Sequence, residues 1–400
     1  MSKSAERTTQ SERHEVVILG GHFAGVSAAH YILRHVFPTL IKSFPTTTPH
    51  VTLVAPHTHF FWNIAAPRYL CARDVIDASK IFISLDKAFE AYPSEQYTIL
   101  QGNAKRVDPA TSKVEVSLVD GTTANLDYAS LVVATGRKSN SPLWQINDSG
   151  DKTKLEFAKI QDRLQTARSA IIAGGGPIGV ETAGEIASRH QNIDVRLYSG
   201  TDRVLPRLLP STSATAEKRL QDLGVRVIHG QRYTGVEEGE QSVVSFGKNS
   251  TEVTDVFIDA TGGRPNSSFL PTDWTNGKGF VRTNEKTTRV EGANSDGVYA
   301  LGDVASYSDG TLNGVFRAVP AMGSALGTDA ARRLGGQAAF PVRHYSPMVG
   351  TQLVPTGPKG GVGQLFGWRI FSSMVWAIKS RAFFVDNAPG IVIGNGFRKP

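Results

Sequence analysis

The chain contains two copies of one pattern of apolar and polar positions. Each copy opens with a short, mostly β-branched apolar run, passes through glycines and continues with small and apolar residues at helical spacing. The copies read HEVVILGGHFAGVSAAHYIL from His14 and SAIIAGGGPIGVETAGEIA from Ser169. This order predicts a strand, a tight turn and a helix, which together begin a βαβ unit. Repetition of the pattern predicts two related domains.

Further apolar runs extend both units. A second strand is predicted at His50–Val54 in the first copy and at Asp194–Tyr198 in the second. Later runs end in small residues that let the backbone pass close to a bound molecule: Ala134-Thr135-Gly136, Ala260-Thr261-Gly262 and Gly302-Asp303. We therefore predict an α/β fold with two doubly wound dinucleotide-binding domains, the second inserted in the first, and a C-terminal α+β region.

The order of these elements also suggests the domain boundaries. We assign residues 1–14 to a disordered tail, 15–145 and 268–340 to the first domain, 146–267 to the second, and 341–400 to a C-terminal region that closes the site of the first. Residues Phe37–Pro49 are rich in Thr and Pro and are predicted to be a surface loop. Residues Leu365–Lys379 are predicted to be a helix that is either mostly buried or lies at an interface.

Composition and charge narrow the class of protein. Hydrophobic residues make up 40% of the chain and charged residues 20%, which is typical of a folded globular protein. The net charge of +7 suits an anionic ligand, but the basic residues are scattered, so no nucleic acid is expected as a partner. The single cysteine, Cys71, excludes an intramolecular disulfide and favours an intracellular, cytoplasmic location. A small-molecule partner and a monomer or homodimer are expected.

The second glycine turn has the complete GxGxxG spacing. Gly174, Gly176 and Gly179 follow a predicted strand, and Pro177 and Ile178 open the helix. Glycine allows the tight turn and the close approach of a pyrophosphate to the helix N-terminus, so this turn is predicted to bind a nicotinamide dinucleotide. The next strand ends at Ser199 without a carboxylate. Arg203 is either a solvated surface side chain or a partner of a 2′-phosphate, which leaves both NADH and NADPH as donors.

The first glycine turn departs from this spacing. It reads Gly20-Gly21-His22-Phe23-Ala24-Gly25, with His22 in place of the middle glycine, and the following strand ends in Ala55-Pro56 rather than an acid. A Cβ atom at position 22 crowds a pyrophosphate, although an imidazole N–H could donate a hydrogen bond to it. We still predict a dinucleotide here, with the Asp303 carboxylate accepting hydrogen bonds from ribityl hydroxyls of a flavin.

Two glutamates and two histidines complete the candidate chemistry. Glu181, two residues past Gly179, is predicted to point toward the nicotinamide, whereas Glu185 is predicted to be a surface charge. His57 and His59 form an HxH pair with no further ligand at metal-binding spacing, so no metal site is expected.

With these motifs in this order, the chain resembles the two-domain flavoprotein reductases of the pyridine nucleotide-disulfide oxidoreductase superfamily. Within them it is most similar to the apoptosis-inducing-factor-like group that contains ferroptosis suppressor protein 1, close to the type II NADH dehydrogenases. Group-specific segments are Asn63–Arg68, Gly361–Gln364, Gly367-Trp368 and Ala377–Arg381.

The resemblance implies site residues and cofactors. FAD is expected to contact the Gly20–Ala24 loop, Arg68, the backbone at Ala104, the Ala134–Gly136 segment and Asp303. The nicotinamide nucleotide is expected at Gly174–Gly179, Ser199 and Gly262. Glu181 is implied beside the nicotinamide, and Lys379 beside the isoalloxazine, where a cation stabilises the anionic reduced flavin. The resemblance also implies a quinone site and peripheral membrane contact in the C-terminal region.

These expectations give a function with two alternatives. The main one is an FAD-dependent NAD(P)H oxidoreductase that passes hydride from nicotinamide to flavin N5 and then electrons to a quinone-like acceptor, because Cys71 alone cannot form a redox disulfide. One alternative is a flavoprotein oxidase or tailoring oxidoreductase that acts on a specialised metabolite with oxygen as acceptor. The other is a redox-sensing or nucleic-acid-binding protein.

Overall fold

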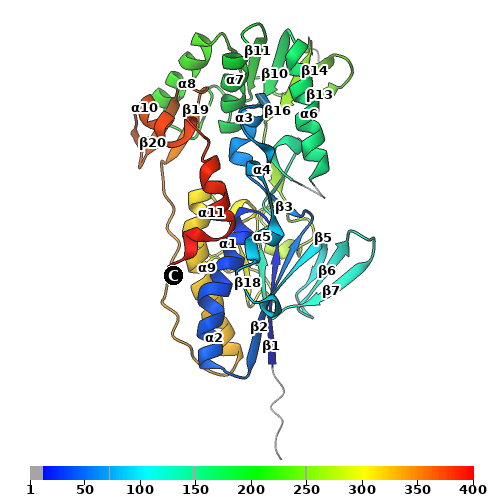
Figure 1. The fold of residues 1–400 in the computed structure, drawn as a ribbon, viewed down its shortest axis with the longest axis vertical. Coiled ribbons are helices and arrows are strands. Elements are labelled where there is room, and N and C mark those ends of the chain that lie inside the picture. Colours follow the sequence, from blue (N-terminus) through cyan, green and yellow to red (C-terminus); the bar gives the residue numbers. More distant parts are fainter. Residues whose placement is uncertain (1–11, 72, 147–149, 248–249) are drawn as a thin grey trace, which may run out of the picture.

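The computed structural model describes residues 12–71, 73–146, 150–247 and 250–400. Figure 1 shows two lobes, each with a central sheet flanked by helices, and a C-terminal segment that runs along both. The predicted α/β fold with two dinucleotide-binding sheets and a C-terminal region is confirmed.

The first sheet has seven strands in the order β18-β8-β1-β2-β5-β6-β7. Five of them are parallel, so their carboxyl ends meet at one edge, where open α/β sheets bind ligands. The last two strands extend β5 as an antiparallel meander. The bounds are β1 Glu12–Leu19, β2 Thr47–Ala55, β5 Tyr97–Asp108, β6 Lys113–Leu118, β7 Thr123–Asp127, β8 Ser130–Val133 and β18 Val298–Ala300.

The second sheet has four parallel strands in the order β12-β11-β10-β16. Its strands are β10 Ser169–Ala173, β11 Asp194–Ser199, β12 Arg226–His229 and β16 Val256–Asp259. A separate meander packs beside it: β13 Tyr233–Glu237, β14 Ser242–Phe246 and β15 Ser250–Thr254. Two short antiparallel strand pairs join segments that are distant in the sequence: β3 His59–Phe61 with β4 Phe82–Ser84, and β9 Arg137–Ser139 with β17 Gly263–Pro265.

The helices cover both sheets and bury apolar side chains against them. They are α1 Phe23–Tyr31, α2 Phe37–Ser43, α3 Ala66–Cys71, α4 Ala78–Ile81, α5 Leu85–Phe89, α6 Asp151–Thr166, α7 Pro177–Arg189, α8 Pro210–Asp222 and α9 Leu312–Arg333. The C-terminal region adds a small sheet, β19 Gln352–Pro355, β20 Gly361–Leu365 and β21 Trp368–Arg369, with helices α10 Ser372–Val375 and α11 Ala388–Val392. None of the helices in the described part of the chain is long and apolar enough to cross a bilayer.

Near the N-terminus, two expectations are wrong. Residues Phe37–Ser43 form helix α2 rather than a surface loop, because Phe37 and Leu40 continue the buried stripe of the preceding helix and Pro38 lies in the first turn, where no amide N–H is needed. β2 then begins at Thr47. The predicted tail falls mostly on residues 1–11, which lie outside the described residues, and residues 12–14 already belong to β1.

The expectation for Leu365–Lys379 is also wrong in its first half. Phe366 and Gly367 both have positive φ angles, so the chain turns there and β20 pairs with β21 as a hairpin. Helix α10 begins only at Ser372 and continues into a π-helical turn, η7 (Trp376–Ser380). Glycine at position 367 adopts this conformation without a Cβ clash.

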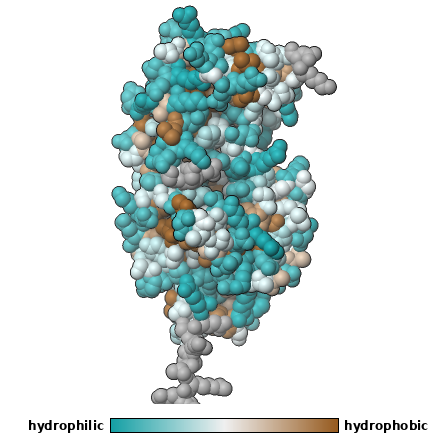
Figure 2. All heavy atoms as spheres, turned by 90° about the vertical axis from the view of Figure 1, so that its right-hand side faces the viewer, coloured by the Kyte–Doolittle hydropathy of each residue, from teal (hydrophilic) through white to brown (hydrophobic). Residues whose placement is uncertain are grey.

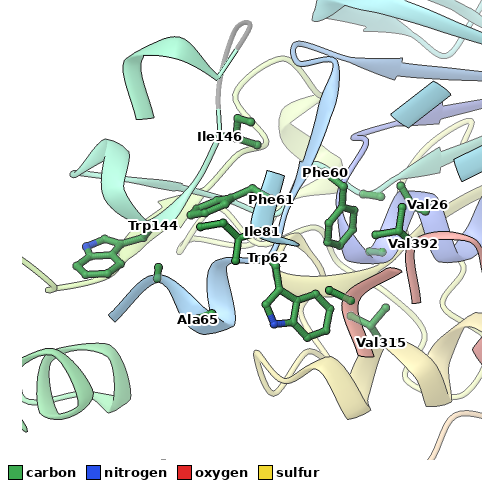
Figure 3. Close-up of a cluster of buried hydrophobic side chains, with 14 of the residues drawn as sticks. Val26, Phe60, Phe61, Trp62, Ala65, Ile81, Trp144, Ile146, Val315 and Val392 are labelled. Carbon is green, nitrogen blue, oxygen red and sulfur yellow. The ribbon is translucent and has the colours of Figure 1, made fainter. Parts of the chain in front are cut away.

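The largest core lies between the two lobes and the C-terminal segment. Phe60, Phe61 and Trp62 are fully buried at its centre. Figure 3 shows Phe60 and Trp62 on the side of Val26, Val315 and Val392, and Phe61 beside Ile81 and Ile146. The lobes and the C-terminal segment therefore share one apolar core.

Candidate functional site

The two glycine turns have the same backbone geometry. A Cβ atom on Gly25 would overlap the carbonyl oxygen of Gly20, and one on Gly179 would overlap that of Gly174. Gly20 and Gly174 have φ angles of +116° and +123° and lie against the ends of β8 and β16. Only glycine fits these positions, so the predicted strand-turn-helix geometry holds in both domains.

The turns differ at the residue that faces the helix N-terminus. A Cβ atom on Gly176 would have no heavy atom within 4 Å, so space for a phosphate remains beside the first amides of α7. Position 22 holds an imidazole instead. It stacks on Phe60 with 4.7 Å between ring centroids, and its Nε2–H donates to the Phe61 carbonyl oxygen at 2.5 Å.

This geometry fixes the tautomer of His22. Because Nε2 carries the proton, Nδ1 is left as an acceptor in the neutral ring. Removal from water lowers the pKa of His22 to about 4, so the ring is neutral at physiological pH. The expectation that this imidazole donates to a pyrophosphate is therefore not met in this conformation: its N–H is directed to Phe61.

Other features of the first turn fit FAD. His57 follows β2, and its Cε1 would lie 3.3 Å from a Cβ atom on Gly21. Its Nδ1 is buried and has no hydrogen-bond partner in the described structure, as expected of a group that awaits a ligand hydroxyl. Asp303 lies in the 3₁₀ turn Gly302–Val304, whose first residue lies beside Ala24, and desolvation raises the pKa of the Asp303 carboxyl group. Hydrogen bonds from ribityl hydroxyls would favour its charged form.

The structure also locates the remaining predicted cofactor contacts. Phe23 and Ala24 are the first residues of α1, Pro177 and Ile178 begin α7, and Gly302 lies with its α carbon facing Ala24. Ala134, Thr135 and Gly136 follow β8, and Gly262 follows β16, each at the carboxyl edge of its sheet. Ala104 lies on β5 just beyond Gln101, the last residue paired with β2. These residues surround the edges where the two dinucleotides are predicted.

The two predicted catalytic residues meet across the interface between α7 and the C-terminal region. Lys379 Nζ donates to Glu181 Oε1 at 2.6 Å and to the Leu353 carbonyl oxygen at 3.2 Å. The side chains are 14% and 4% exposed. Burial raises the pKa of Glu181, and the neighbouring Lys379 ammonium opposes that shift. One ammonium N–H remains for a third partner.

Arg68 has a different role from the flavin contact implied by the resemblance. Its Nε and Nη2 donate to both carboxylate oxygens of Glu185 at 3.0 and 2.6 Å, and Nη1 donates to the carbonyl oxygens of Ser380 and Arg381. Every guanidinium nitrogen is thus engaged. Glu185 is 0% exposed and is not the predicted surface charge. The group joins α3, α7 and the C-terminal region.

The C-terminal region carries a set of exposed apolar side chains, as the interface alternative for Leu365–Lys379 requires. Trp368 and Phe371 are 80% and 78% exposed, and Phe366, Met374, Trp376 and Ile378 are also exposed. We call these six residues the C-terminal apolar patch. By contrast, Figure 2 shows a mostly hydrophilic face with apolar side chains in small separate groups. Such a patch is typical of a binding surface.

The described residues contain no group of three or more His, Cys, Asp or Glu side chains placed to hold a metal ion. Cys71 is buried, and burial raises the pKa of its thiol well above the usual range. A protonated, buried thiol is a poor nucleophile.

Replacing His22 with glycine is expected to strengthen FAD binding roughly tenfold, because the side chain that narrows the space beside the α1 N-terminus is removed. The same change removes the stacking on Phe60 and should lower the melting temperature of the FAD-free protein. Fluorescence titration with FAD and thermal melting measure the two effects. His35→Gly, on the helical segment that follows α1, is the matched control and should leave FAD affinity unchanged. Equal or weaker binding in His22→Gly would contradict the expectation.

Comparison with known proteins extends these observations. Residues 14–325 match the family model described as pyridine nucleotide-disulphide oxidoreductase. The chain is 31% identical to the oxidoreductase phnG of Penicillium herquei, over 98% of this chain and 99% of that one. It is 27% identical to ferroptosis suppressor protein 1 of Homo sapiens, over 95% and 96%. The structure of NDH2 from Plasmodium falciparum with NADH superposes with a TM-score of 0.66 at 17% identity, over 96% and 100% of the chains.

Proposed function

Because the chain belongs to the pyridine nucleotide-disulphide oxidoreductase family, which typically binds FAD and uses NAD(P)H, we propose that it is a flavin-dependent NAD(P)H oxidoreductase of a small organic metabolite. The observation that carries this proposal is the Lys379–Glu181 pair, which joins the helix of the second glycine turn to the C-terminal region. The 31% identity to a fungal oxidoreductase over nearly the whole of both chains favours a tailoring reaction, in which the metabolite accepts the two electrons that NAD(P)H gives up.

The residues of this chain have separate tasks in the proposed reaction. The amides at the start of α7, beside Gly176, hold the pyrophosphate of the nicotinamide nucleotide. His57 and Asp303 hold hydroxyl groups of FAD, which supplies the two-electron relay between donor and acceptor. Glu181 orients Lys379, and the remaining ammonium N–H would be available to stabilise negative charge that develops during electron transfer.

The cysteine content supports a direct route for electrons to the substrate. Relatives that use a redox disulfide need two neighbouring thiols, whereas this chain has only Cys71, which is buried. The acceptor must therefore approach the flavin itself.

Quinone reduction is the second candidate function, and the C-terminal apolar patch favours it. Trp376 and Ile378 of the patch lie on the same turn, η7, as Lys379, whose ammonium faces inward to Glu181. An apolar acceptor, free or dissolved in a membrane, could therefore reach the protein close to the proposed site.

Rates of NAD(P)H oxidation distinguish the two functions. We expect the FAD-loaded protein to oxidise NAD(P)H slowly in air. The rate should rise at least tenfold when an extract that contains the metabolite substrate is added. Absorbance at the flavin band under anaerobic conditions follows the reduction by NAD(P)H separately from reoxidation.

Outcomes of this experiment are clear for each candidate. If a water-soluble quinone reoxidises the reduced flavin rapidly, and extracts that contain aromatic metabolites do not change the rate, quinone reduction would replace the tailoring function. A protein that takes up FAD but is not reduced by either nucleotide would overturn both.

A further inference from the structure

We propose that the second glycine turn selects NADPH over NADH, because Arg203 and Arg232 form a binding site for the 2′-phosphate. This inference rests on the proposed function, in which that turn binds a nicotinamide nucleotide. It adds that the electron donor is NADPH and names the residues that distinguish NADPH from NADH.

The loop after β11 lies where the adenosine ribose is bound in such folds. The Leu205 amide donates to the Gly175 carbonyl oxygen at 2.7 Å, so the loop is tied directly to the glycine turn. A Cβ atom on Gly175 would lie 2.5 Å from Ser199 Oγ. The end of β11 and the turn therefore form one continuous surface, and the residues after Ser199 face the ribose.

The strand end offers no carboxylate to a ribose 2′-hydroxyl. Ser199 is fully buried, and its hydroxyl donates to the Arg203 carbonyl oxygen at 3.1 Å and contacts Thr201 Oγ1 at 3.0 Å. Its side chain thus closes the loop instead of facing a ligand. Asp202 is the one acid between Gly200 and Arg207, and it is exposed. If the loop preferred NADH, Asp202 would be the carboxylate that accepts a hydrogen bond from the ribose 2′-hydroxyl.

Two arginines flank this loop without ion-pair partners in the described part of the chain. Arg232 lies across Gly200, where a Cβ atom would be 2.8 Å from Arg232 Cγ, and its Nε donates to the Gly200 carbonyl oxygen at 3.3 Å. Arg203 donates only from Nη2, to the Pro206 carbonyl oxygen at 3.0 Å, while its Nε is buried and has no partner.

Other arginines of this sheet are paired. Arg226, at the start of β12, binds Asp194 with Nε at 3.0 Å from Oδ1. Arg203 and Arg232, in contrast, lie in the segments that follow β11 and β12 and have no ion-pair partner among the described residues. A dianionic phosphate is the ligand that a planar guanidinium binds with paired, charge-assisted hydrogen bonds.

The test measures dissociation constants of the full-length protein for NADP⁺ and NAD⁺ by calorimetry, with 2′,5′-ADP as a fragment that carries the phosphate without the nicotinamide. We expect NADP⁺ to bind at least tenfold more tightly, which is the contribution of about one charge-assisted hydrogen bond. Arg232→Gln and Arg203→Gln should each weaken NADP⁺ and 2′,5′-ADP binding about tenfold and leave NAD⁺ binding unchanged. Arg226→Gln is the matched control and should change neither.

The opposite results overturn the inference. If NAD⁺ binds as tightly as NADP⁺, the phosphate site is refuted. If Asp202→Asn selectively loses NAD⁺ binding, the loop binds the ribose 2′-hydroxyl, and the phosphate site is refuted as well. Failure to bind either nucleotide would instead overturn the proposed function, so the two failures are distinguishable.

Discussion

Replacing Arg68 with methionine is expected to lower the free energy of unfolding by about 3 kcal/mol, the usual scale for breaking a buried ion pair from one side. The reason is Glu185, which is fully buried and would keep its charge with only Arg189, 3.5 Å away, as a nearby cation. The carbonyl oxygens of Ser380 and Arg381 would lose their donor as well. Chemical denaturation followed by fluorescence measures the change.

Two further variants separate this effect from a general loss of packing. Arg73→Met removes an exposed pair with Asp162 and should cost less than about 1 kcal/mol. The double variant Arg68→Met with Glu185→Gln should recover part of the loss, because no buried charge remains unpaired. If Arg68→Met alone unfolds like the unsubstituted protein, Arg68 does not hold α3, α7 and the C-terminal region together.

Replacing Lys379 with methionine is expected to lower kcat for NAD(P)H oxidation about 100-fold, the scale for removing one preorganised donor from a site where charge develops. The ammonium would no longer contact Glu181 at 2.6 Å. Burial raises the pKa of Glu181 and Lys379 lowers it, so loss of the cation should move this pKa further up. The acid limb of the pH–rate profile should therefore shift to higher pH in the variant.

Steady-state rates across a range of pH test both parts of this expectation. Lys159→Met removes an exposed ion pair of the same 2.6 Å length, with Glu238, and is the matched control. FAD content is measured in each variant, since loss of the cofactor would lower kcat without any shift in pH dependence. An unchanged pH profile at full FAD content would show that Glu181 does not depend on Lys379.

The comparison of His22 with Gly176 shows the limit of motif analysis. The sequence identified the substitution at position 22, but the direction of the imidazole depends on Phe60 and Phe61, which come from strand β3. Likewise, the apolar residues after Leu365 suggested a helix with a buried face. The positive φ angles at Phe366 and Gly367 instead produce a hairpin that leaves Trp368 exposed.

The sequence by itself determined the two glycine turns, the strands that precede and follow them and the absence of a second thiol, because these depend on local sterics, side-chain periodicity and composition. Only the tertiary structure decided which charges meet. Arg68 and Glu185 are 117 residues apart in the chain, and Glu181 and Lys379 are 198 apart. No local spacing connects such residues; each pair forms because packing of α3, α7 and the C-terminal region removes water from the charges and leaves each one with the other as its nearest partner.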